Sequence, residues 1–96
     1  MNETQSLVTS MGECSLGMVG KDHVKALSVQ LDVERNHATV TVALEENTEE
    51  EQLRAFNKLA EVEMMFFDDV SMDVCLSDVE SMRRKRTPAK QLAYFA

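Results

Sequence analysis

Two neighbouring stretches of the sequence alternate between apolar and mostly polar residues, and this feature constrains the fold more than any other. Leucine or valine occupies every second position of residues 27–34, and alanine, valine or leucine occupies every second position of residues 38–44. Such alternation is typical of strands with one buried face. Arg35 and Asn36 lie between the stretches, and asparagine tolerates the left-handed backbone of a tight turn. The sequence therefore predicts a β-hairpin.

A two-residue turn at Arg35 and Asn36 would also set the register of this hairpin. Every inward residue of one strand then meets an inward residue of the other, so that turn and pattern agree. The predicted pairs are Val33 with Ala38, Leu31 with Val40, Val29 with Val42 and Leu27 with Leu44.

A helix is predicted after the hairpin. Thr48 and Glu51 form a capping box, in which the threonine hydroxyl accepts from a backbone N–H and the glutamate reaches back. Apolar residues then recur at spacings of three and four, which is typical of an amphipathic helix with one buried stripe. The stripe predicted to face the core is Leu53, Phe56, Ala60, Met64 and Phe67, with Leu59 beside it.

A third alternating stretch, residues 70–77, gives the order ββαβ. We expect a small α+β domain with a three-stranded antiparallel sheet in the order 2-1-3 and one helix on one face. The alternative places the third strand parallel to the second and beside it. It is less favoured, because parallel sheets are usually covered on both faces.

The two ends of the chain lack this regularity. Residues 1–22 contain all three glycines and show no sustained period, so we expect a flexible or partly ordered N-terminal arm. Residues 23–80 form the single ββαβ domain, and residues 81–96 form a basic, disordered tail. The second face of the sheet would then be covered by the arm or by a second subunit in a homodimer.

The residues that could carry catalysis are few and scattered. His23 and His37 fall at opposite ends of the first predicted strand, and Cys75 falls in the middle of the third. Nucleophilic catalysis needs a nucleophile within reach of a base, and zinc needs three or four clustered ligands. The glycines precede the strands and form no phosphate-binding loop. We therefore expect no enzyme, no catalytic residue, no metal and no cofactor.

The expected compartment is the cytoplasm. Cys14 and Cys75 are too few for a disulfide framework and are expected to be buried or half-buried free thiols. The uncharged stretch of residues 14–20 is too short to cross a membrane. The first residues lack the basic segment of a signal peptide.

Charge is divided sharply along the chain. Residues 1–80 hold all seventeen acidic but only five basic residues, which leaves −12, whereas residues 81–96 carry +5 and no acid. An acidic body repels nucleic-acid phosphate and suits a basic protein partner. The tail residues that could bind a polyanion are Arg83, Arg84, Lys85, Arg86 and Lys90.

These features predict a non-enzymatic regulator or inhibitor that binds another protein through its acidic surface. Methionine and phenylalanine side chains make adaptable contacts, and nearby carboxylates would attract a basic partner. The predicted partner-binding residues are Met65, Phe66, Glu50, Glu61, Asp68 and Asp69. Two alternatives stay open: an accessory protein held weakly on nucleic acid by its tail, and a dimeric sensor of a small ligand.

Overall fold

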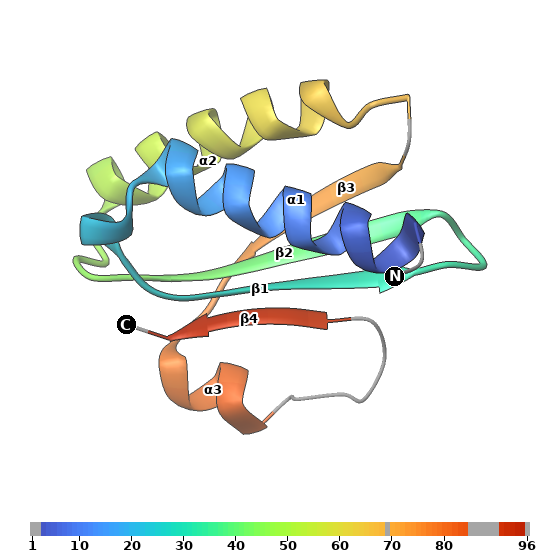
Figure 1. The fold of residues 1–96 in the computed structure, drawn as a ribbon. Coiled ribbons are helices and arrows are strands. Elements are labelled where there is room, and N and C mark those ends of the chain that lie inside the picture. The colour runs from blue at the N-terminus through green and yellow to red at the C-terminus, as the bar shows by residue number, and fades with distance from the viewer. Residues whose placement is uncertain (1–2, 69, 85–90, 96) are drawn as a thin grey trace.

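A computed structural model describes residues 3–68, 70–84 and 91–95 of the protein, with side chains described for residues 6–68 and 70–82 (Figure 1). The elements follow in the order α1 (Glu3–Val19), η1 (Lys21–His23), β1 (Val24–Asp32), β2 (His37–Leu44), α2 (Glu49–Met65), β3 (Ser71–Leu76), α3 (Val79–Arg84) and β4 (Gln91–Phe95). The coarse prediction of a small α+β domain is confirmed.

The sheet has four strands in the order β3-β2-β1-β4, so the predicted three-stranded antiparallel sheet is wrong. β1 is antiparallel to both β2 and β4, whereas β3 runs parallel to β2 and beside it. β4, which was expected to lie in a disordered tail, takes the place beside β1 that had been assigned to β3. The general preference for parallel strands covered on both faces does not decide this case, because Ser71, Asp73 and Cys75 of β3 are exposed on the second face.

The hairpin is present, but its register differs by two residues from the prediction. Leu31 pairs with Ala38 and Val29 pairs with Val40. The connection is four residues long, residues 33–36, because Arg35 N–H donates to Asp32 Oδ1 at 3.3 Å. An even shift keeps inward residues opposite inward residues. The left-handed backbone predicted for Asn36 is confirmed by its φ of 52°.

Residues Glu3–Val19 form a helix and not an irregular arm. α1 packs on β1 and on α2, with Val8, Met11 and Val19 fully buried. Gly20 ends the helix with φ 100°, a conformation that other residues rarely adopt. The helix therefore covers the same sheet face as α2 and leaves the second face to another element (Figure 1).

α2 begins as predicted, with Glu51 N–H donating to Thr48 Oγ1 at 3.2 Å. Its predicted core face is wrong, however. Ala55, Leu59 and Val62 are the buried residues of the helix, and of the predicted stripe with its neighbour only Leu59 is among them. The helix has apolar residues on two sides. The side that is buried is the one that faces α1 and the sheet, and the sequence of α2 alone does not show where α1 lies.

The second face of the sheet is covered at one end by α3. There Met82 and Val79 pack against Ala26 and Ala43 in a small cluster separate from the main core. Residues 81–84 therefore continue a helix that belongs to the folded domain. The remainder of the predicted tail, residues 85–90 and 96, lies outside the described residues.

Ser15 of α1 offers a test of this packing. It is fully buried, and its hydroxyl oxygen has no hydrogen-bond partner within the part of the chain that the structure describes. A buried unsatisfied hydroxyl costs about 1–3 kcal/mol, so Ser15→Ala is expected to raise the free energy of unfolding by about that amount. Urea unfolding measures the change. Ser10→Ala, at an exposed position of the same helix, is the control for helix propensity. An equal gain in both variants would contradict the burial of Ser15.

Candidate protein-binding surface on α2

The outer side of α2 carries a row of large apolar side chains. At about 100° per residue, positions spaced by three and four fall on one line of the helix. We call this row the outer stripe; it consists of Leu53, Phe56, Ala60 and Met64 on the helix and of Phe67 in the turn that directly follows it. The exposed fractions of its large members are 63% for Leu53, 41% for Phe56, 78% for Met64 and 76% for Phe67. Large apolar side chains exposed in a row are typical of interaction sites.

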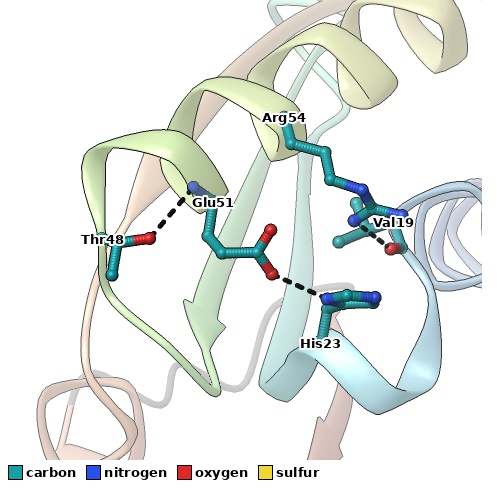
Figure 2. A network of polar contacts seen from close by, with 5 residues as sticks. All are labelled: Val19, His23, Thr48, Glu51 and Arg54. Atoms are coloured by element: carbon teal, nitrogen blue, oxygen red, sulfur yellow. Dashed lines mark hydrogen bonds and ion pairs between the residues drawn. The ribbon is translucent and has the colours of Figure 1, made fainter.

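Two polar contacts fix the orientation of α2 (Figure 2). Arg54 Nη1 donates to the backbone oxygen of Val19 at 2.8 Å, and Glu51 Oε1 lies 2.7 Å from His23 Nδ1. These residues form the side of α2 that is turned toward α1 and η1. On the helical wheel the outer stripe lies about 150° from that side. It therefore faces away from α1.

The border of the outer stripe is acidic. Its exposed charged residues, which we call the acidic rim, are Glu49, Glu50, Glu61, Glu63 and Asp68. The two cations of the helix, Arg54 and Lys58, lie toward the α1 side, where Arg54 is held by Val19. Lys58 Nζ is 3.9 Å from Glu61 Oε2 and offsets part of one rim charge. The apolar row is thus framed by negative charge.

The predicted partner-binding residues agree with this surface in part. Glu50, Glu61 and Asp68 are exposed, and Met65 is 55% exposed. Phe66 is half-buried and packs against the core, so only part of it is open to a partner, and its role in binding stays a prediction. Asp69 lies outside the described residues.

Met64 and Phe67, which were predicted to be buried, are exposed instead. The signal that could have located them was a second apolar row on the helical wheel, formed by Ala55, Leu59, Val62 and Phe66. Its small and branched members, Ala55, Leu59 and Val62, are the ones that are buried.

Both histidines are half-buried and paired with carboxylates. Glu51, which was expected to complete the capping box, turns to His23 and ties η1 to the start of α2 (Figure 2). His37 Nε2 lies 3.0 Å from Asp73 Oδ2 and links β2 to β3. Both contacts join neighbouring elements, which is sufficient to explain them.

Cys14 and Cys75 are free thiols, as predicted; Cys14 is half-buried, but Cys75 is exposed. Across residues 6–68 and 70–82, no three histidine, cysteine or carboxylate side chains cluster in a way that could hold a metal ion. None of the described helices is both long enough and apolar enough to cross a bilayer.

The second face of the sheet contains a small pocket of about 170 Å³. Its described lining has no charged side chain and consists of Ser28, Gln30, Thr41, Cys75, Leu76, Ser77 and Met82. These groups offer hydroxyls, one amide and one thiol. They do not single out a ligand class.

The basic residues predicted to bind a polyanion are only partly placed. The backbone of Arg83 and Arg84 belongs to α3, while Lys85, Arg86 and Lys90 fall outside the described residues. Polyanion binding stays a prediction.

Comparison with known proteins adds no relative. No protein-family model matches the chain, and no curated protein sequence matches it. The outer stripe and its acidic rim are therefore the features on which a function can be based.

Proposed function

We propose that the protein is a small binding module that recognises a basic protein partner through the outer stripe and acidic rim of α2. It would regulate or inhibit the partner by covering a basic surface with which the partner binds another molecule. The observation that carries the proposal is the outer stripe itself, whose large side chains are 41–78% exposed on a well-anchored helix.

The outer stripe and the acidic rim would contribute differently to binding. Burial of apolar side chains contributes about 25 cal/mol per Å², and a few large anchors usually dominate the affinity of an interface. The carboxylates of the acidic rim contribute mainly to the rate of encounter and to the choice of partner. A partner surface that alternates apolar and basic groups satisfies both parts.

Binding, not catalysis, is the proposed mode of action. The outer stripe, on which the proposal rests, consists of apolar residues and includes no nucleophile and no general base. The net charge of −12 over residues 1–80 also disfavours a nucleic acid as the ligand of this surface.

Selection of peptides from a random library tests the proposal. We expect the selected peptides to be basic and to contain apolar residues. The double variant Leu53→Ser/Met64→Ser is expected to weaken their binding at least tenfold without unfolding the protein, because both side chains are mostly exposed. Isothermal titration calorimetry measures the affinity.

Val33→Ser is the matched control, since Val33 is an apolar residue that is 55% exposed but lies in the β1–β2 connection. It should leave the affinity unchanged. The proposal fails if peptides bind the double variant as tightly as the parent, or if the control loses as much affinity as the double variant.

A further inference from the structure

β3 has an open edge. It is the outermost strand of the sheet, and among the described residues no strand pairs with its outer side. Ser71 N–H donates to the backbone oxygen of Asn36, just before β2, at 3.1 Å, and Ser77 N–H donates to the backbone oxygen of Val42 of β2 at 2.9 Å. Backbone groups alternate in direction along a strand. Met72, Val74 and Leu76 therefore direct their N–H and C=O groups away from β2, toward the open side.

The outer stripe lies on the same side of the molecule as this edge. α1 packs on β1 and β4, whereas α2 packs on β3, and the outer stripe is on the side of α2 away from α1 (Figure 1). The side chains of Val74 and Leu76 are half-buried and contact the main core. An open backbone ladder is thus bordered on one face by exposed apolar side chains.

The opposite face of the same edge carries one exposed carboxylate, that of Asp73. The side chain of Asp73 is 70% exposed there, beside His37. Glu63 and Asp68 of the acidic rim are exposed on the α2 side. A segment lying along β3 would therefore meet apolar groups on one face and carboxylates at its margins.

We propose that the basic partner binds by adding an extended segment to β3 as a fifth strand of the sheet. Apolar residues of the segment would alternate with basic ones, with the apolar side chains under the outer stripe and the basic side chains toward Asp73. The added strand runs antiparallel to β3, which is the more stable pairing. This inference rests on the proposed function and specifies how the partner is held.

A second copy of the chain fits this edge less well. A two-fold pairing of β3 with β3 would join two outer stripes, but it would also bring two sets of Asp73, Asp68 and Glu63 into one interface. Like charges that face each other across a sheet are destabilising. Charge complementarity therefore favours a basic segment.

A capped peptide of eight residues, alternating valine and lysine, is the probe for this mode of binding. In an antiparallel addition, residues that share a face with Val74 direct their amides toward β3. N-methylation of the valine amides is therefore expected to lower the affinity at least tenfold. N-methylation of the lysine amides, which keeps charge and composition, should change the affinity less than threefold.

The outcomes separate this inference from the proposed function. If both methylated peptides bind like the parent peptide while Leu53→Ser/Met64→Ser weakens binding, strand addition is wrong and the proposed function stands. If neither methylation nor the double variant has an effect, both are wrong. Loss on methylation of the lysine amides alone would overturn the antiparallel direction. Absence of binding at millimolar peptide in dilute salt would overturn strand addition.

A variant of the protein tests the same edge from the other side. Val74→Pro removes an outward N–H that β2 does not use, and proline is tolerated at edge strands. It should abolish peptide binding, whereas Val74→Thr, which keeps the amide, should not; circular dichroism checks folding. Sedimentation of the parent identifies self-association. A parent dimer that Val74→Pro dissociates, with peptide binding unchanged, would assign the edge to a second copy and overturn the inference.

Discussion

Truncation of the chain after Ser81 is expected to abolish cooperative folding. The truncation removes β4, which pairs with β1 along five residues. β1, a central strand whose side chains belong to the main core, would then become an unpaired edge of the sheet. It also removes Met82, which is 6% exposed and packs on Ala26 and Ala43. A buried methionine alone contributes about 2–5 kcal/mol, within a total of about 5–15 kcal/mol for a typical domain.

Thermal unfolding followed by circular dichroism measures the effect of the truncation. The matched control is the full chain with Lys85→Ser, Arg86→Ser and Lys90→Ser, which removes three tail charges but retains the residues of β4. We expect this control to unfold cooperatively. A truncated protein that melts within a few degrees of the full chain would show that residues 1–81 fold without β4 and α3.

The truncated chain and the triple serine variant also test whether the basic residues near the C-terminus bind polyanions themselves or only support the fold. The sequence suggested a tail that binds polyanions independently of the fold. In the structure, however, Arg83 and Arg84 belong to α3, the other three basic residues follow between α3 and β4 in the sequence, and β4 belongs to the sheet. Truncation removes both β4 and the basic residues, so a loss of nucleic-acid binding on truncation would not separate the two. A loss of binding in the folded serine variant would assign binding to Lys85, Arg86 and Lys90.

Local patterns predicted the elements whose signals are contained within a few residues. The alternation of residues 27–34 and 38–44 located β1 and β2, and the spacing of Thr48 and Glu51 located the start of α2. Asn36 was correctly expected to have a left-handed backbone. Each of these features depends on contacts between near neighbours in the chain.

The errors concern features that depend on distant partners. The turn of the hairpin was predicted as two residues because the apolar pattern continues through Val33, yet the side chain of Asp32 closes a longer turn. β4 was overlooked because its strand signal, Leu92 in register with Val29 and Tyr94 in register with Leu27, has meaning only beside β1. The position of β3 depends on which edge β4 leaves open.

The candidate site was only partly predictable for the same reason. The sequence showed that α2 is rich in apolar and acidic residues, and it placed Glu50, Glu61 and Asp68 correctly on the surface. It could not decide which of two apolar rows packs on the core. That choice depends on α1, whose glycines concealed a helix from the pattern within residues 1–22.

The choice between the two rows can be measured directly. Leu59→Ala is expected to lower the free energy of unfolding by about 2–5 kcal/mol, because Leu59 is fully buried between the helices and the sheet and its removal leaves a cavity. Phe56→Ala is expected to cost less than half as much, since 41% of the residue is already exposed. Both substitutions introduce alanine into the same helix and thus favour helix formation.

Which of the two variants loses more unfolding free energy decides which row packs on the core. Urea unfolding at a single pH measures both losses. From size alone, the loss of a phenylalanine side chain would cost more than the loss of a leucine side chain. The structure predicts the reverse order. If Phe56→Ala is the more damaging variant, then Leu53, Met64 and Phe67 belong to the core with Phe56, and no apolar surface is left on α2 for a partner to bind.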